Sequence, residues 1–489
     1  MDLDVAVIGC GVSGANIARR LSAYNIKTAI LEKSADVSFG TSKANSGIIH
    51  GGFHHNKKYL KARLEMQGSL MFDQLKRELN FPFRRCGIIV AALHRDEMKV
   101  VEHLYLQGVE NEVIGIELCS RQRILELEPK LSEDAVGGLY APGGGIIEPY
   151  RFVYALVESA QKNGVELLTN FKVSKAKWAG GSSNGVWTVS AEDGREVKAR
   201  YVINAAGLFA DEVSKIFGAE DFKITARKGE YYLLDRLTKA CPSKVVFPVP
   251  TAVSKGMLVI PTVEGTALVG PTADSCEDKD DFSTTQKKLE QILISGKTII
   301  PSLSQNDVIT SFAGLRPCLE EDFYIEASKK APAFVQVAGI QSPGLTASPA
   351  IAEYVKNILV DIGLQLTEKP HWDPFVENHP CARYMIDANN EKGNESGLAK
   401  LDSLIQSDPA WGNIVCRCEN VSEAEIVQAV KLGHTTLDGV KYFTRAQMGR
   451  CQGGFCTYKI IKIIMRESEL SLEQVTKHGG ASCVLAGTL

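Results

Sequence analysis

The chain has 489 residues, of which 44% are hydrophobic and 23% charged, with a formal net charge of -3. This composition is typical of a globular protein with room for two large domains and a small one, and the charge argues against a nucleic-acid partner. No apolar run approaches the roughly 20 residues that a membrane-spanning helix needs. A strand is predicted to begin within three residues of Met1, so we expect no signal peptide.

The N-terminal segment has the pattern of a dinucleotide-binding unit. Residues 4–9 predict a buried parallel strand, the Gly-x-Gly-x-x-Gly loop at 9–14 opens a predicted helix over 15–23, and 27–32 predict a second strand. The glycines allow the backbone to approach a pyrophosphate at the helix N-terminus. Glu32 can accept hydrogen bonds from ribose hydroxyls and disfavours a 2′-phosphate. The complete unit favours a nucleotide site over the alternative, a tight turn without a ligand.

Further elements follow from periodicity and from glycine and proline positions. Residues 41–52 are small, polar and glycine-rich, and such a segment can lie against a flat ring system. Helices are predicted at residues 60–79, 148–163 and 347–362. Strands are predicted at residues 166–174, 186–189, 197–205 and 334–339, with shorter β-rich pieces between 222 and 318. Residues 366–412, which contain several prolines, predict a linker with some structure.

Near the C-terminus, a Cys-x-Cys pair is followed after 32 residues by a Cys-x4-Cys pair, formed by Cys416, Cys418, Cys451 and Cys456. Four thiolates can hold a 2Fe–2S cluster or a zinc ion. The cluster is favoured because structural zinc sites usually space each ligand pair by two to four residues; unliganded structural cysteines are the third alternative. The other eight of the 12 cysteines are scattered singly, which suits a reducing cytoplasm.

Two short helices are expected around these cysteines. Ser422 and Glu425 form a predicted capping box for a helix over 423–432. A second helix is predicted over 457–466, directly after the last cysteine of the set. These helices would fix the separation between the two cysteine pairs.

The N-terminal unit together with Asn204-Ala205-Ala206-Gly207 and the segments 313–317 and 342–346 resembles the FAD-dependent D-amino-acid oxidase superfamily, over about residues 1–365. Within it, residues 45–52 and 60–63 are similar to glycerol-3-phosphate and L-2-hydroxyglutarate dehydrogenases. The C-terminal segment, with its two cysteine pairs, is similar to the bacterioferritin-associated ferredoxin-like 2Fe–2S domain.

The resemblance implies an α/β FAD-binding domain of the Rossmann-like, glutathione-reductase type, with an inserted mixed β-sheet substrate domain and a small helical iron–sulfur domain. The FAD-binding segments are expected at residues 1–80, 148–215 and 316–365. The substrate domain is expected at residues 81–147 and 216–315. A linker over 366–412 would precede a 2Fe–2S domain over 413–489.

The resemblance also implies the residues that hold FAD. They come from the glycine loop, the end of the second strand, the glycine-rich segment, the middle of the chain and the start of the last large helix. They are Gly9, Gly11, Gly14, Glu32, Lys33, Ser42, Asn45, Ser46, Gly47, Val173, Ala206, Gly207, Gly339, Gly344, Leu345 and Thr346.

Oxidation of an alcohol beside a flavin requires a base for the hydroxyl proton and a cation for an anionic substrate. His50, His54 and His55 are the candidates for the base because histidine titrates near neutral pH. Arg316 is the first candidate for the anion, since its guanidinium forks onto carboxylate or phosphate; a structural ion pair is the alternative. Arg63 and Lys255 are weaker candidates for the same role.

We therefore expect an FAD-dependent dehydrogenase of an anionic secondary alcohol, with sn-glycerol 3-phosphate as first substrate and the cluster as an electron relay. Where glycerol-3-phosphate dehydrogenases tend to carry Arg-Tyr, this sequence has His54-His55, which keeps L-2-hydroxyglutarate or another 2-hydroxy acid as the alternative. An electron-transfer or redox-sensing subunit is the third reading. The expected partners are a small anionic substrate and an electron-accepting protein or partner subunits. Any membrane contact would occur through such a partner. The expected location of the protein is the cytoplasm.

Overall fold

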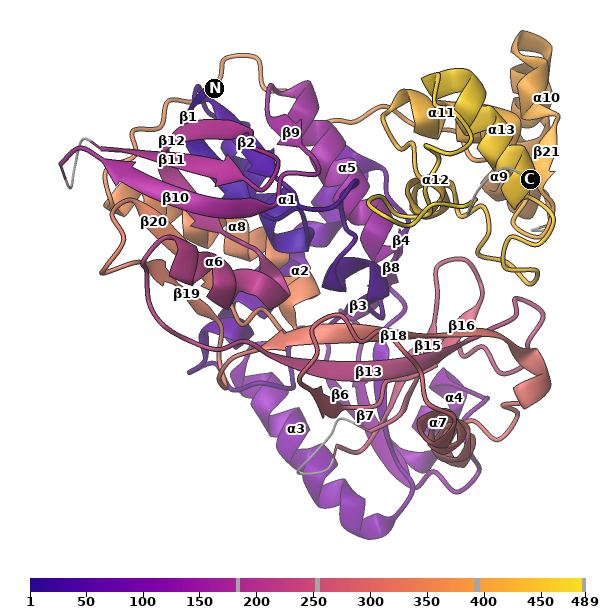
Figure 1. The fold of residues 1–489 in the computed structure, drawn as a ribbon. Helices are drawn as coiled ribbons and strands as arrows, with labels where there is room; N and C mark the ends of the chain where they lie inside the picture. The colour runs from indigo at the N-terminus through magenta and orange to yellow at the C-terminus, as the bar shows by residue number, and fades with distance from the viewer. Residues whose placement is uncertain (182–184, 251–255, 391–395, 486–489) are drawn as a thin grey trace. The chain divides into compact units, whose positions relative to one another are not determined.

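The computed structural model describes residues 1–181, 185–250, 256–390 and 396–485 (Figure 1). The chain divides into two compact units, of which the first comprises Met1–Lys33 and Val37–Val376 and the second comprises Ser34–Asp36 and Glu377–Leu489. None of the described helices is long and apolar enough to cross a membrane.

One sheet of the first unit has the strand order β10-β11-β12-β1-β2-β9, with β20 beside the second half of β12 and β19 beyond it. Its central strands are parallel, and β10, β11 and β19 are added through antiparallel pairs. The bounds are β1 (Asp2–Ile8), β2 (Thr28–Leu31), β9 (Glu166–Leu168), β10 (Val173–Ala179), β11 (Val186–Ala191), β12 (Glu196–Asn204), β19 (Tyr324–Ala327) and β20 (Phe334–Ala338).

Helices cover both faces of this sheet, which explains why β1 is apolar from Val5 to Ile8. Successive side chains of a strand point to opposite faces. Val5 and Val7 pack with Ile17 of one helix layer, whereas Ala6 and Ile8 belong to the core on the other face. The helices of this part are α1 (Val12–Leu21), α2 (Leu60–Leu79), α5 (Pro149–Lys162), α6 (Ala210–Ile216) and α8 (Gly344–Asp361).

The second sheet of the first unit has the order β17-β13-β16-β15-β14-β5-β7-β6, with β18 on the other side of β13 (Figure 1). It is mixed, because β14 and β5 are parallel and the other pairs are antiparallel. Its strands are β5 (Ile88–Ala92), β6 (Glu117–Ser120), β7 (Gly137–Ala141), β13 (Thr225–Leu234), β14 (Val245–Pro248), β15 (Leu258–Pro261), β16 (Ala267–Gly270), β17 (Asp274–Cys276) and β18 (Val308–Cys318).

Three helices and a small sheet complete the first unit. Alternation again divides the core: Ile88 and Val90 of β5 belong to one cluster, whereas Ile89 packs in the other with Ile124 and Ile292. The helices are α3 (Met98–Glu110), α4 (Arg121–Leu127) and α7 (Gln286–Ile299). The small sheet consists of β3 (Ile48–Ile49), β8 (Gly145–Ile147) and β4 (Phe83–Arg84).

One strand expected from the sequence is two strands. Residues 166–174 were predicted as one element, but Glu166–Leu168 pairs with β2 and Val173 begins β10. Between them lies a turn in which Asn170 has a φ of 52°, a left-handed conformation that a strand cannot contain. The long pairing of β13 with β18, which runs from Thr225↔Cys318 to Leu234↔Val308, was not predicted.

The second unit is small and mostly helical. The stretch predicted as a linker contains two helices, and the capping box of Ser422 and Glu425 at the start of α11 is confirmed. The elements are α9 (Ala382–Asn390), α10 (Ser396–Ser407), β21 (Ile414–Cys416), β22 (Val421–Ser422), α11 (Glu423–Lys431), α12 (Leu437–Thr444) and α13 (Thr457–Ser468). The predicted class, an α/β domain joined to a mixed-sheet domain and a small helical domain, is confirmed.

Candidate active site and cysteine centre

The residues predicted to bind a dinucleotide gather at one edge of the first sheet. β1, β2, β12 and β20 are mutually parallel, so their carboxyl ends meet at this edge. Gly9, Glu32, Ala206 and Gly339 each follow one of these ends by one or two residues. Ligands of open α/β sheets bind in the crevice outside the carboxyl ends of the strands.

The glycine loop between β1 and α1 leaves no room for a side chain at Gly9 or at Gly14. Gly9 has a φ of 98°, and a Cβ on it would lie 2.5 Å from the carbonyl oxygen of Ala205. A Cβ on Gly14 would lie 2.0 Å from the carbonyl oxygen of Gly9. Gly11 caps the N-terminus of α1, so the positive end of this helix faces the loop. The backbone here therefore has the form that receives a pyrophosphate.

Two side chains hold the loop in place. The backbone N–H of Cys10 donates to Oε2 of Glu32 over 2.7 Å, and that of Val12 donates to Oγ of Ser42 over 2.9 Å. Glu32 is buried at the end of β2. A buried carboxylate at this point is the acceptor that the ribose of a bound dinucleotide requires. The donor and acceptor set of this edge thus fits the adenosine half of FAD.

The glycine-rich segment packs closely against its neighbours. Gly47 has a φ of 72°, and a Cβ on it would lie 2.3 Å from the carbonyl oxygen of Ile147; its N–H donates to Oδ1 of Asn45 over 2.8 Å. The backbone N–H of His50 donates to Oγ1 of Thr346 over 2.9 Å. The start of α8, with Gly344, Leu345 and Thr346, is thereby held beside this segment, as a second helix N-terminus near the predicted ring site.

The other predicted FAD residues lie near the same edge, and their roles remain predictions. Nζ of Lys33 sits 3.2 Å above the centre of the Phe209 ring. Gly207, with a φ of 59°, begins a short 3-10 turn after β12, and Val173 is the first residue of β10. Ser46 lies between Asn45 and Gly47, and its side chain contacts the hydroxyl of Tyr231 on β13.

The three candidate histidines form a cluster with aromatic neighbours. The ring centres of His50 and His54 are 5.9 Å apart, and those of His54 and His55 are 6.5 Å apart. The His54 ring lies 5.2 Å from the ring of Phe247. Nε2 of His50 is 3.2 Å from Oγ of Ser342, within hydrogen-bonding distance. His50 is thus the histidine that the structure joins to the segment before α8.

Arg316 lies on β18 opposite Arg227 of β13, and its side chain reaches a residue that the sequence did not reveal, Tyr231 of the same strand β13. The Tyr231 hydroxyl is hydrogen-bonded with the side chains of Arg316 and Ser46, and burial raises its pKa. Its ring stacks on Phe312, the residue opposite it in the ladder, with 5.1 Å between the ring centres. A fixed phenol therefore connects the predicted anion site to the predicted FAD segment.

Close backbone packing sets the position of Arg316. A Cβ on Gly314 would lie 2.8 Å from the carbonyl oxygen of Ala44, and Oγ1 of Thr41 donates to the carbonyl oxygen of Leu315 over 2.7 Å. The strand that carries Arg316 is therefore fixed against residues 41–44. Arg63 is exposed on α2, and its predicted role is untested. Lys255 lies outside the described residues.

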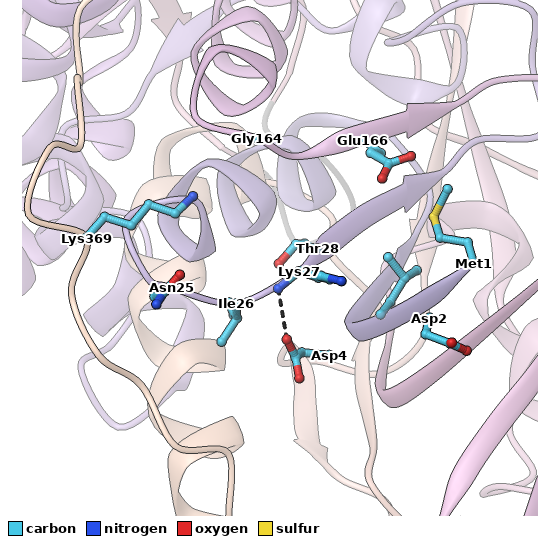
Figure 2. Close-up of a pocket in the computed structure, with 11 residues that line it drawn as sticks. Met1, Asp2, Asp4, Asn25, Ile26, Lys27, Thr28, Gly164, Glu166 and Lys369 are labelled. Atoms are coloured by element: carbon cyan, nitrogen blue, oxygen red, sulfur yellow. Dashed lines mark hydrogen bonds between the residues drawn. The ribbon is translucent and has the colours of Figure 1, made fainter.

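A pocket of about 600 Å³ lies at the opposite edge of the first sheet (Figure 2). Its lining includes Met1, Asp4, Lys27 and Lys369, and the backbone N–H of Lys27 donates to Oδ2 of Asp4 over 2.9 Å. Because β1 and β2 begin here and the glycine loop follows their other ends, this pocket is separate from the nucleotide edge.

In the second unit, the four predicted cysteine ligands come together. The sulfur atoms of Cys416 and Cys418 are 3.8 Å apart, and those of Cys418 and Cys451 are 3.9 Å apart. The thiol of Cys416 also shares a hydrogen bond with Cys456. Among the described residues, no three His, Cys, Asp or Glu side chains are placed so that they could hold a single metal ion. Two pairs of thiols match the two irons of a 2Fe–2S cluster.

Hydrogen bonds and burial divide the four thiols into two kinds, two with a raised pKa and two with a lowered pKa. The bond between Cys416 and Cys456 raises the pKa of Cys416 and lowers that of Cys456. Burial raises the pKa of Cys418 to about 12. A hydrogen bond from the backbone N–H of Phe455 lowers the pKa of Cys451. Backbone N–H groups aimed at cysteine sulfurs are among the features that tune iron–sulfur clusters.

Comparison with known proteins agrees with both sites. The family model described as FAD dependent oxidoreductase matches residues 4–358, and the model described as BFD-like [2Fe-2S] binding domain matches residues 414–466. The first covers the two sheets of the first unit. The second begins at β21 and ends within α13.

Relatives of known name cover either the whole chain or its first unit. A protein named glycerol 3-phosphate dehydrogenase from Caloramator mitchellensis is 41% identical over 99% of this chain and 98% of its own. A structure of L-alpha-glycerophosphate oxidase from Mycoplasma pneumoniae with FAD bound is 32% identical, with a TM-score of 0.73 over 78% of this chain and 99% of its own. The L-2-hydroxyglutarate dehydrogenase of Arabidopsis thaliana is 26% identical over 73% of this chain and 83% of its own.

These matches extend what the geometry indicates. The glycine loop, the buried Glu32 and the two helix N-termini fit FAD, and the four cysteines fit a 2Fe–2S cluster. The protein is an FAD-dependent oxidoreductase that carries an iron–sulfur centre in its second unit. The chain belongs to the FAD dependent oxidoreductase family and ends in a BFD-like [2Fe-2S] binding domain.

Proposed function

We propose that this enzyme oxidises sn-glycerol 3-phosphate to dihydroxyacetone phosphate and passes the electrons to an acceptor, with the 2Fe–2S centre as relay. The observation that carries the proposal is the similarity to the Caloramator mitchellensis glycerol 3-phosphate dehydrogenase, which spans both units. A relative that shared only the flavin unit would leave the role of the cysteine centre open.

In this proposal the residues around Arg316 bind and orient the substrate. The Arg316 guanidinium receives the phosphate, and the Tyr231 hydroxyl, bonded to Arg316 and Ser46, limits how the guanidinium can turn. One nitrogen of the His50 imidazole takes the hydroxyl proton, while the other, Nε2, contacts Oγ of Ser342 and thereby holds the ring in place. FAD, when bound, supplies the acceptor for the hydride from the carbinol carbon. Phe247 and Phe312 exclude water from the same region.

A 2-hydroxy acid such as L-2-hydroxyglutarate is the second candidate substrate. His54 and His55 stand where phosphate-specific enzymes tend to carry Arg-Tyr, so Arg316 is the arginine that we assign to the anion. One guanidinium fork matches a carboxylate as well as it matches a phosphate. The similarity to L-2-hydroxyglutarate dehydrogenase over the first unit favours the same alternative.

The second unit implies a protein partner. A 2Fe–2S centre transfers single electrons, so we propose an electron-accepting protein or partner subunit that docks on the second unit. Any contact with a membrane would come through that partner.

Anaerobic reduction of the purified protein tests the substrate. Glycerol 3-phosphate, L-2-hydroxyglutarate and smaller 2-hydroxy acids are each added without oxygen, and the flavin absorbance is followed. We expect glycerol 3-phosphate to bleach the flavin fastest and at the lowest concentration. Faster bleaching by a 2-hydroxy acid would reassign the substrate, and bleaching only by a reduced donor protein would make the chain an electron carrier.

A further inference from the structure

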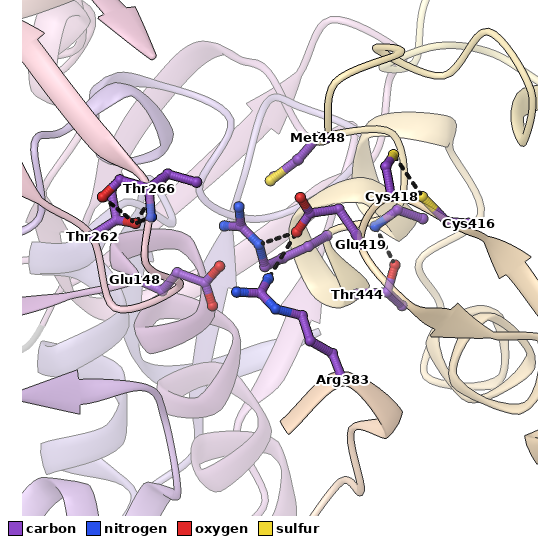
Figure 3. A network of polar contacts seen from close by, with 12 residues as sticks. Glu148, Thr262, Thr266, Arg383, Cys416, Cys418, Glu419, Thr444 and Met448 are labelled. Atoms are coloured by element: carbon purple, nitrogen blue, oxygen red, sulfur yellow. Dashed lines mark hydrogen bonds and ion pairs between the residues drawn. The ribbon is translucent and has the colours of Figure 1, made fainter. Parts of the chain in front are cut away.

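A buried charged triad lies beside the cysteine centre of the second unit (Figure 3). Oε2 of Glu419 accepts from Nη1 of Arg383 over 2.8 Å and from Nε of Arg445 over 3.0 Å. The side chains of Arg383 and Glu419 are each 3% exposed, and that of Arg445 is 9% exposed. Buried charges require close partners, and here the Glu419 carboxylate accepts hydrogen bonds from both guanidinium groups.

The triad is adjacent to a cluster ligand. Glu419 directly follows Cys418 in the chain, and a Cβ on Gly449 would contact both Sγ of Cys418 (2.5 Å) and Oε1 of Glu419 (3.1 Å). The Glu419 carboxylate and the Cys418 sulfur therefore lie close together, at the position that a side chain of residue 449 would occupy. Arg445 ends α12 with a φ of 71°, six residues before Cys451.

Arg383 comes from outside the matched iron–sulfur segment. It lies on α9, whereas the match to the BFD-like domain begins at residue 414. Its Nε is also 3.5 Å from Oδ2 of Asp387, which is 36% exposed and therefore partly screened by solvent. Helix α9, which lies outside the matched iron–sulfur segment, thus contributes a buried charge to the cysteine centre.

Charge beside an iron–sulfur cluster changes its reduction potential. Reduction adds one negative charge to the cluster, so a nearby cation favours the reduced form and a nearby anion opposes it. In a poorly solvated interior these interactions are weakly screened. Each buried guanidinium group of the triad therefore favours the reduced cluster, and the buried carboxylate of Glu419 opposes it.

We propose that Arg383, Glu419 and Arg445 set the reduction potential of the cluster by their charge, as positioning and tuning residues that do not ligate iron. The proposal rests on the assignment of a 2Fe–2S cluster to the four cysteines. It does not depend on which alcohol the flavin unit oxidises. A role limited to folding is the competing explanation, because buried ion networks can serve structural specificity alone.

Substitutions of opposite charge sign separate the two explanations. The full-length protein with its cluster is titrated with a chemical reductant, and the cluster signal is followed by electron paramagnetic resonance. Arg383→Gln removes a buried cation, so we expect the potential to fall. Glu419→Gln removes the buried anion without a large change of shape, so we expect it to rise. Each shift should be about tenfold in the reduction equilibrium, or about 59 mV for a one-electron couple.

Arg466→Gln is the matched control for charge. It removes a cation from α13 of the same unit, but Arg466 is 54% exposed and pairs with Glu423 over 2.7 Å. Its potential should stay within error of the unmodified protein, since exposed ion pairs contribute little.

The measured potentials distinguish a tuning role of the triad from a purely structural one. A fall for Arg383→Gln, with a rise for Glu419→Gln where that variant keeps its iron, supports the proposal. If only one variant retains the cluster, the direction in which its reduction potential shifts decides between the two explanations. Shifts in the same direction, shifts no larger than that of Arg466→Gln, or loss of iron from both variants would overturn it and leave the triad as a structural clamp. Because no alcohol substrate is used, an error in the proposed substrate would not affect this result.

Discussion

The nucleotide edge of the first unit consists mainly of backbone, whereas the cysteine centre of the second unit consists of side chains. At the nucleotide edge, Gly9 and Gly14 are so close to neighbouring carbonyl oxygens that no side chain fits. At the cysteine centre, the sulfur atoms of Cys416, Cys418 and Cys451 provide the chemistry. The first site should therefore be destroyed by adding atoms and the second by exchanging a single one.

The largest effect is expected at the glycine loop. Gly14→Val would place its Cβ 2.0 Å from the Gly9 carbonyl oxygen, so the loop must open and the protein should be purified without FAD. Flavin absorbance per chain measures this result. Gly40→Ala is the control, because a Cβ there meets nothing within 4 Å. Full flavin content in Gly14→Val would contradict the assignment of the loop.

Loss of one sulfur should abolish the second site and spare the first. Cys451→Ser replaces a thiol of lowered pKa by a poor iron ligand, so iron content and the paramagnetic signal of the reduced protein should disappear. FAD should stay bound, and the substrate should still reduce it. Cys483→Ser, at an exposed cysteine outside the set, should change nothing. Stoichiometric zinc without iron in anaerobically prepared parent protein would overturn the cluster reading.

Within the first unit, substrate binding should depend on one guanidinium. Arg316→Ala removes charge-assisted hydrogen bonds to the substrate, which we expect to cost about 3 kcal/mol, roughly a hundredfold in kcat/KM. FAD content should be unchanged, and a neutral substrate analogue should suffer much less. Arg123→Ala, at an exposed arginine of α4, is the control. Unchanged turnover in Arg316→Ala would show that this arginine is structural.

The Tyr231 hydroxyl should have a smaller effect in the same place. Tyr231→Phe keeps the ring that stacks on Phe312 but removes the hydrogen bonds to Arg316 and Ser46. We expect kcat/KM to fall about fivefold, or about 1 kcal/mol, mainly through KM. Tyr232→Phe, at the next residue of the strand, should be neutral. A loss as large as that of Arg316→Ala would instead place Tyr231 among the reacting groups.

The smallest effect is expected at a helix cap of the second unit. Oγ of Ser422 accepts from the backbone N–H of Glu425, and Ser422→Ala should destabilise this unit by about 1 kcal/mol. Thermal loss of the cluster absorbance measures the change. Ser403→Ala, on the exposed surface of α10, is the control. Equal melting of both variants would show that the cap does not limit stability.

Local features of both sites could be predicted from the sequence. The strand, glycine loop, helix and Glu32 are neighbours in the chain, and so are Ser422 and Glu425. The contact of Tyr231 with Arg316 could not be predicted, because it depends on the register in which two distant strands pair. The same holds for Arg383 on α9 and Glu419 in the turn between β21 and β22, which are 36 residues apart in the chain. Spacing reveals ligands close in sequence, whereas tertiary packing selects the groups that support them.

One measurement tests the central claim, that an alcohol-reducible flavin and a 2Fe–2S centre act in the same chain. Glycerol 3-phosphate is added anaerobically to the full-length protein, and flavin absorbance and the paramagnetic signal of the cluster are recorded together. We predict that the flavin bleaches and that the cluster signal then appears, whereas in Cys451→Ser only the flavin responds. An unchanged flavin with every anionic alcohol tested, or a bleached flavin whose electrons never reach an intact cluster, would contradict the account.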